Sequence, residues 1–348
     1  MINDHNLEIT EQEYRDLEIP SYSLLASIAK QGIDILGGAK TQMFQLKFGS
    51  LVDDICFEPS VVANKYYRGS PVTISSGNPK KIIDLVFDKF CIQGSETELN
   101  YYDTEIVAAA RKLGVYDKYD DAKILKTILV DKNENYFEDK VKSINKVHVK
   151  DEMYEMAVAA ADTLKTNDFT NIYFQDDDAE LETFYQFKTV QTINGHQVKV
   201  MLDCMVVDHK NKVIYPVDLK TGESPADMFD EVFLLHKYYL QGGLYRSAIK
   251  AIVDKDPDLE GYVVASFDFV YLSKMNVYKP LVFNMPMLLH KAAWTGFTDR
   301  FGFVHKGLTE LLGLYNDWKE GFSMYTKEQN SNRGRVIMNN LIKEEDEG

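Results

Sequence analysis

The sequence predicts an α/β (α+β) fold in which helices flank a central mixed β-sheet. Residues 182–220 contain three consecutive runs rich in Val, Ile, Met, Phe and Tyr, a pattern typical of paired strands. Helical periodicity follows at 231–250, and two further strand-like runs come at 261–273 and 277–284. An early hairpin followed by a strand, helix, strand order indicates a sheet with both parallel and antiparallel neighbours.

The hairpin carries the most informative residues. Strands at 196–207 and 212–220 flank the polar turn Asp-His-Lys-Asn and are expected to pair antiparallel. Side chains alternate across a strand, so Asp218 and Lys220 share one face. On the partner strand, Asp203 can then lie beside Asp218.

Two neighbouring carboxylates and a lysine are suited to metal-assisted hydrolysis. Carboxylates held close repel one another, and burying them is costly unless a cation compensates. Mg²⁺ takes carboxylate oxygens while keeping several waters, and it can activate water against a phosphodiester. Taken alone, an acid-x-lysine string is more often a salt-bridged strand end. The apolar run at 213–217 ahead of Asp218 instead favours a central strand whose buried charges need partners.

The next helix adds two polar residues on one face. Gln241 and Tyr245 are four positions apart in the helical segment 231–250, so their side chains lie on the same side. On an isolated helix they would be a surface glutamine and a core tyrosine. Here the helix follows the acid–lysine strand after one crossover, which favours a shared site.

In this order, the motifs resemble those of the PD-(D/E)XK nuclease superfamily. The matching residues are Asp203, then Asp218-Leu-Lys220, then Gln241-x-x-x-Tyr245, and they look most like the RecE-like and RecB-like, phage-type exonuclease branch. The resemblance implies a restriction-endonuclease-like core. It extends over two parts of the chain, roughly 20–60 and 150–290.

The resemblance also implies a role for each motif residue. Asp203, Asp218 and the backbone carbonyl of Leu219 would bind Mg²⁺ or Mn²⁺. Lys220 would orient or deprotonate the attacking water and offset charge on the scissile phosphate. The helix residues would position the nucleic-acid backbone or a water: Gln241 and Tyr245.

Two outer ligands are implied in the same way. Asp53 stands where RecE-like nucleases carry the histidine of a Gly-x-x-x-His helix, although an exposed helix turn is the competing interpretation. Glu182 opens the run before Asp203 and is the best match for a further acidic ligand. Its competitor is Glu180.

We expect one nuclease domain over residues 1–325. Within it, residues from about 78 to 150 form a helical insertion, and residues 288–320 form a helical C-terminal region. The acidic tail at 327–348 is polar enough to be flexible.

Composition bounds the setting. The formal charge of −15 does not predict a DNA-binding surface, but lysines at 123–150 permit a local basic channel in an acidic body. Three distant cysteines offer no zinc spacing and indicate a reducing compartment. Neither a transmembrane run nor a signal pattern is present, so we expect no membrane partner and a cytoplasmic protein, in a bacterial host cell if phage-encoded.

The activity that the resemblance implies is Mg²⁺-dependent exonuclease action on the ends of linear duplex DNA, in recombination or DNA processing by a phage or prophage. It further suggests a single-strand annealing protein as a partner and a ring-shaped homo-oligomer. Three alternatives stay open. They are an endonuclease of the same fold, a catalytically inert DNA-binding protein on a nuclease scaffold, and a metal-dependent RNase.

Overall fold

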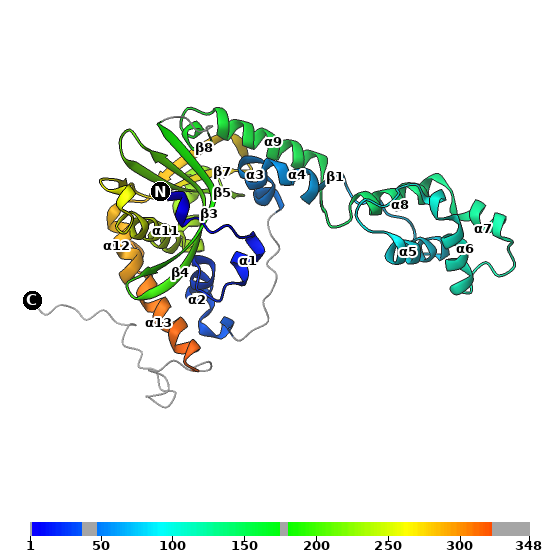
Figure 1. Ribbon diagram of the computed structural model, residues 1–348, viewed down its shortest axis with the longest axis horizontal. Coiled ribbons are helices and arrows are strands. Elements are labelled where there is room, and N and C mark those ends of the chain that lie inside the picture. Colours follow the sequence, from blue (N-terminus) through cyan, green and yellow to red (C-terminus); the bar gives the residue numbers. More distant parts are fainter. Residues whose placement is uncertain (1, 37–46, 175–179, 322–348) are drawn as a thin grey trace, which may run out of the picture. The chain divides into compact units, whose positions relative to one another are not determined.

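The computed structural model describes residues 2–36, 47–174 and 180–321, and it divides into two compact units (Figure 1). The first unit comprises Met1–Gln45 and Asp162–Gly348, and the second comprises Leu46–Ala161. We expected a single domain over 1–325 with a helical insertion at about 78–150. The structure instead has two compact units, and the second unit is larger than that insertion. The tail expected to be flexible, 327–348, lies outside the described residues, as does the segment 37–46 of the expected core.

The first unit is built on a mixed sheet. Within its described residues the sheet has six strands in the order β3-β4-β5-β7-β8, with β6 also paired to β5. Pairing is antiparallel except between β5 and its neighbours β6 and β7, which run parallel to it. The strand bounds are β3 Leu181–Ile193, β4 His196–Asp208, β5 Val213–Gly222, β6 Val263–Val264, β7 Asp268–Ser273 and β8 Asn276–Asn284.

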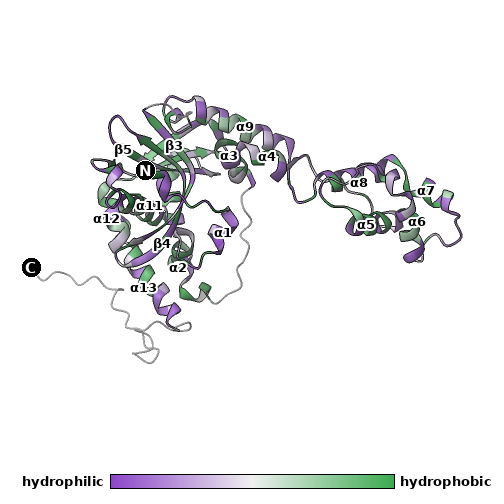
Figure 2. Cartoon of the chain, in the orientation of Figure 1, coloured by the Kyte–Doolittle hydropathy of each residue, from purple (hydrophilic) through white to green (hydrophobic). Residues whose placement is uncertain are grey.

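Helices cover one face of this sheet. Helix α11 packs on β3, β4, β5 and β6, and helices α2 and α12 pack on α11 (Figure 1). Hydrophobic residues gather on α11 and on the strands around it, as the colours in Figure 2 show. The remaining elements of the unit are η1 Ile2–His5, α1 Glu11–Asp16, α2 Tyr22–Gln31, η2 Ile33–Leu36, η4 Asn171–Tyr173, η5 Ala226–Met228, α10 Phe229–His236, α11 Tyr238–Val253, η6 Pro257–Leu259, α12 Met287–Thr295, β9 Phe297–Thr298, β10 Val304–His305 and α13 Leu308–Lys319.

The second unit is mainly helical and has its own hydrophobic core. Ile82, Ile106, Ile124 and Phe137 are fully buried there, so these helices pack mainly on one another. Its elements are α3 Lys47–Phe57, α4 Pro59–Lys65, β1 Tyr66–Arg68, α5 Asn78–Phe90, η3 Leu99–Tyr102, α6 Asp103–Lys112, α7 Asp121–Ile128, α8 Asp131–Lys142 and β2 Val147–Val149, with α9 Asp151–Thr166 crossing into the first unit.

The predicted fold class is confirmed, with a central mixed sheet flanked by helices. Two details differ. The helix expected at 231–250 is broken into α10 and α11 at Lys237, whose φ of 62° is left-handed. The C-terminal region expected to be helical from 288 to 320 contains the small antiparallel hairpin β9–β10 between its helices.

The described residues contain no helix that is both long and apolar enough to cross a membrane.

Candidate active site

Strands β4 and β5 hold the two motif aspartates next to each other. The hydrogen-bonded ladder between β4 and β5 ends at the pair Cys204 and Val217. Asp203 is the next residue on β4, and Asp218 is the next residue on β5. The backbone N–H of Leu219 donates to Oδ2 of Asp203 at 3.1 Å. The hairpin therefore brings together the residues that the sequence placed on it.

An irregularity in the β3–β4 ladder coincides with Asp203. On β4 the core-facing residues include Leu202 and then Met205, and on β3 they include Phe184 and then Phe187, so strict alternation is interrupted on both strands. At the same level Gln186 has a φ of 50°, in the left-handed region. Such local departures from the regular ladder re-aim side chains and are frequent beside active sites.

Asp218 is the most deeply buried charge of the group, with 1% of its surface exposed. Its Oδ1 accepts a hydrogen bond of 2.5 Å from Nε2 of Gln241, and its Oδ2 forms an ion pair with Nζ of Lys220. These contacts offset the cost of burying the carboxylate. They also join α11 to β5.

Lys220 is held as a cation. Burial alone would lower the pKa of its ammonium, but the charge of Asp218, with smaller effects from Tyr238 and Asp203, raises that pKa well above its usual value. The Nζ atom also lies 5.1 Å from the ring centre of Tyr238. At neutral pH this lysine is therefore protonated, which suits charge compensation and the orientation of water better than the removal of a proton.

Tyr245 lies one helical turn beyond Gln241 and is buried. Its ring meets that of Tyr22 edge-on at 6.3 Å and that of Phe267 at 6.1 Å. Burial raises the pKa of the Tyr245 hydroxyl, so it stays protonated and can act as a hydrogen-bond donor. Sequence reasoning did not assign Tyr22 to the site, because only the tertiary packing of α2 on α11 brings it there.

The structure does not bring Glu182 to the aspartates. Glu182 pairs with Val207, four residues along β4 from Asp203, which corresponds to about 13 Å of strand. Its Oε2 lies 3.2 Å from Nε2 of His209 at the other end of the hairpin. Its competitor Glu180 pairs with Lys210 at the same end. The prediction of Glu182 as a ligand is therefore corrected, since it lies too far along the sheet.

Asp53 lies on α3 in the second unit, so it is not among the residues that the first unit assembles. Its neighbour Asp54 is engaged within the second unit, where it accepts a hydrogen bond of 2.6 Å from Tyr66 and pairs with Lys65. A ligand role for Asp53 stays a prediction.

The oxygen atoms of the cluster fit a hard divalent cation. No group of three or more His, Cys, Asp or Glu side chains able to hold a metal occurs among residues 2–36, 47–174 and 180–321. Two carboxylates are nevertheless enough for Mg²⁺, which keeps much of its water shell. Oε1 of Gln241 is buried without a hydrogen-bond partner, and Oδ2 of Asp218 makes an ion pair but no well-formed hydrogen bond. Both atoms could accept hydrogen bonds from metal-bound water or bind the cation.

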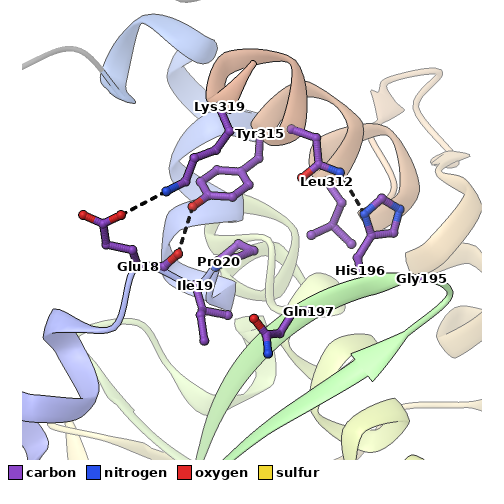
Figure 3. Close-up of a pocket in the computed structure, with 10 residues that line it drawn as sticks. Glu18, Ile19, Pro20, Gly195, His196, Gln197, Leu312, Tyr315 and Lys319 are labelled. Carbon is purple, nitrogen blue, oxygen red and sulfur yellow. Dashed lines mark hydrogen bonds and ion pairs between the residues drawn. The ribbon is translucent and has the colours of Figure 1, made fainter. Parts of the chain in front are cut away.

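A cavity of about 240 Å³ lies elsewhere in the first unit and contains none of the motif residues (Figure 3). It is bounded by residues 18–20, the β3–β4 turn and α13. Lys319 pairs with Glu18 at 3.1 Å, and Asn316 contacts His196 at 3.1 Å across it. The cavity lacks paired acids, so it does not compete with the aspartate cluster as a hydrolytic centre.

Comparisons with known proteins give little beyond this geometry. No protein-family model matches the chain, and no curated protein matches it. Among solved structures, it is similar to a protein from Eubacterium rectale that carries the provisional name of an exonuclease, with a TM-score of 0.34 and 14% identity. The match covers 85% of this chain and 95% of the other. A likeness of this size does not carry an inference about activity, so the functional case rests on the aspartate cluster.

Proposed function

We propose that this protein is a metal-dependent deoxyribonuclease that removes nucleotides from the ends of linear duplex DNA. The observation that supports it best is the buried carboxylate of Asp218, which contacts both Lys220 and Gln241. Beside it, the carboxylate of Asp203 accepts a hydrogen bond from the backbone N–H of Leu219. A buried group whose pKa is shifted by specific charged neighbours, as that of Lys220 is by Asp218 and Asp203, is a candidate for a functional site.

In this proposal Asp203, Asp218 and the carbonyl of Leu219 hold Mg²⁺ or Mn²⁺. The bound cation would lower the pKa of water and offset charge on phosphorus. Lys220 contributes a second positive charge and orients the nucleophile. Gln241 fixes the Asp218 carboxylate, and the protonated hydroxyl of Tyr245 is available to a water or a phosphate oxygen.

The wider setting belongs to the same proposal. Action in recombination or DNA processing, a single-strand annealing partner and a ring of identical subunits all follow from the motif resemblance. We also propose that the protein acts in the cytoplasm, in a bacterial host cell if it is phage-encoded.

A second candidate function is DNA binding without catalysis. The observation that favours it is the gathering of only two carboxylates among the described residues. An endonuclease of the same fold would keep the same cluster.

One experiment separates these functions. Linear duplex DNA labelled at one end, and covalently closed circular DNA, are incubated with the protein and Mg²⁺. The proposal expects progressive loss of label from the linear DNA and an intact circle. Cutting of the circle would identify an endonuclease, and binding without any product would identify the inert scaffold. Single-stranded RNA in a parallel reaction tests for ribonuclease activity.

A further inference from the structure

The β9–β10 hairpin presents aromatic side chains to solvent. Phe301 is 67% exposed and Phe303 is 66% exposed, and Val304 beside them is also exposed. The guanidinium of Arg300 lies 4.8 Å from the ring centre of Phe301. Two neighbouring exposed rings with an arginine are an unusual combination for a surface loop, because water contact disfavours large apolar groups.

The single acidic residue of this hairpin is turned inward. Asp299 accepts hydrogen bonds of 2.9 Å from the backbone N–H groups of Phe301 and Phe303 through Oδ1. Its Oδ2 lies 2.9 Å from Nε2 of His305, and both side chains of this pair are largely buried. These bonds fix the loop that carries the aromatic rings. Arg300 is the exposed charged residue of the hairpin, and its guanidinium also lies 3.5 Å from Oδ2 of Asp230 in a solvent-exposed ion pair.

The hairpin is attached to the elements that form the candidate active site. Nζ of Lys237 donates to Nδ1 of His305 at 3.4 Å, and the hydroxyl of Tyr239 donates to the backbone carbonyl of Lys306 at 2.9 Å. Lys237 directly precedes Tyr238, whose ring lies against Lys220. The hairpin is therefore anchored to the start of α11, through residues that lie four and two positions before Gln241.

We propose that Phe301 and Phe303, together with Arg300, bind unpaired nucleotides of the strand that enters the candidate active site. This proposal rests on the proposed nuclease function, because the hairpin is attached to that site. Aromatic rings stack on any base, and an arginine adds attraction to the phosphates, so the contact would be insensitive to sequence. A strand-end enzyme needs such tolerance, since it meets every sequence in turn.

The test measures binding of a fluorescent single-stranded oligonucleotide in EDTA, which prevents hydrolysis. The double variant Phe301→Ala/Phe303→Ala is compared with the native chain and with Tyr278→Ala. Tyr278 is a matched control, because it is 72% exposed on strand β8 and is not part of the hairpin. We expect the double variant to bind about tenfold or more weakly, since stacking contributes strongly for each base. The control should bind as the native chain does.

An oligonucleotide with abasic residues provides a second arm. The native chain and the double variant should bind this ligand equally, because it offers no base to stack. Equal binding of the base-containing oligonucleotide by both proteins would overturn the proposal. It would also be overturned if the double variant changed only the oligomeric mass, which would make the hairpin a contact between copies of the chain.

The proposed function fails by a different result. One result is that the native chain releases no nucleotides in Mg²⁺, while the double variant binds single strands more weakly than the native chain. The nuclease assignment is then wrong and the hairpin binding site is supported. The other result is that the native chain digests linear DNA, while the double variant binds single strands as tightly as the native chain. The nuclease assignment is then supported and the hairpin binding site is wrong.

Discussion

At the scale of single residues, Asp218 links the parts of the candidate site. Its carboxylate is buried between the amide of Gln241 and the ammonium of Lys220. The hydrogen bond from Gln241 and the charge of Lys220 therefore both stabilise the same buried negative charge. Removing any partner leaves another charge or dipole buried without compensation.

Replacing Gln241 tests this stabilisation. Gln241→Leu removes the donor to Oδ1 of Asp218, so we expect stability to fall by about 1–3 kcal/mol. Nuclease activity should fall about 10- to 100-fold, as for other groups that orient a metal ligand. Urea unfolding and end-labelled DNA measure the two effects. Gln191→Leu, in strand β3 where the amide donates a hydrogen bond to the hydroxyl of Thr189, should change both by little. Equal losses in the two variants would contradict this role.

Replacing Lys220 tests a separate prediction about metal binding. Its ammonium competes with a cation for the Asp218 carboxylate, so Lys220→Met should bind Mg²⁺ more tightly than the native chain while losing hydrolysis. Because bound ligand stabilises the folded state by mass action, Mg²⁺ should raise the melting temperature of Lys220→Met more than that of the native chain. An identical Mg²⁺ response in both proteins would show that Lys220 does not face the metal-binding oxygens.

The sequence correctly predicted that Asp203 and Asp218 lie side by side, and it placed Glu182 too near them, for physical reasons. Asp203, Asp218 and Lys220 lie on one hairpin, where local pairing and alternation determine which residues meet. The position of Glu182 depends on the register of the long strand β3, and counting along the chain does not give that register. The structure places Glu182 opposite Val207.

At the scale of elements, the close packing of α11 on α12 positions Gln241. A Cβ added at Gly243 would lie 2.5 Å from the Cβ of Ala293, so this glycine permits a helix contact that no larger residue allows. The break between α10 and α11 was not predictable, because it occurs at Lys237, a residue that gives no helix-stop signal.

Two glycine-to-alanine substitutions should change the stability of the protein in opposite directions. Gly243→Ala should destabilise the protein by about 1–3 kcal/mol through overpacking, partly offset by better helix propensity. Gly313→Ala, in α13 where nothing lies within 4 Å of an added Cβ, should stabilise it by up to about 1 kcal/mol. Thermal unfolding measures both. The double variant Gly243→Ala/Ala293→Gly should recover part of the loss, and a stabilised Gly243→Ala would refute the close contact.

At the scale of the whole molecule, the chain consists of two units with separate cores. The fold class could be predicted because strand and helix periodicities are local. The division into units could not, because it depends on which helices bury one another's apolar faces. The role of Asp53 depends on that same information, since it lies in the second unit.

The separate cores predict separable unfolding. Both tryptophans of the chain, Trp294 and Trp318, belong to the first unit, so tryptophan emission reports that unit alone. Phe137→Ala should cost the second unit about 3–5 kcal/mol, because this side chain is fully buried in its core. Circular dichroism should then show an earlier helical transition, while the emission transition keeps its midpoint. A shared shift of both signals would mean that the units unfold together.

The central claim is that Asp203 and Asp218 form a hydrolytic metal centre, and the rate of nucleotide release from linear duplex DNA tests it most directly. The native chain and Asp218→Asn, which keeps the shape of the side chain but removes its charge, are compared in Mg²⁺ and in EDTA. The native chain should release nucleotides only in Mg²⁺, and Asp218→Asn should be slower by about a thousandfold or more. Native-like release by Asp218→Asn, or release by the native chain in EDTA, would contradict the assignment.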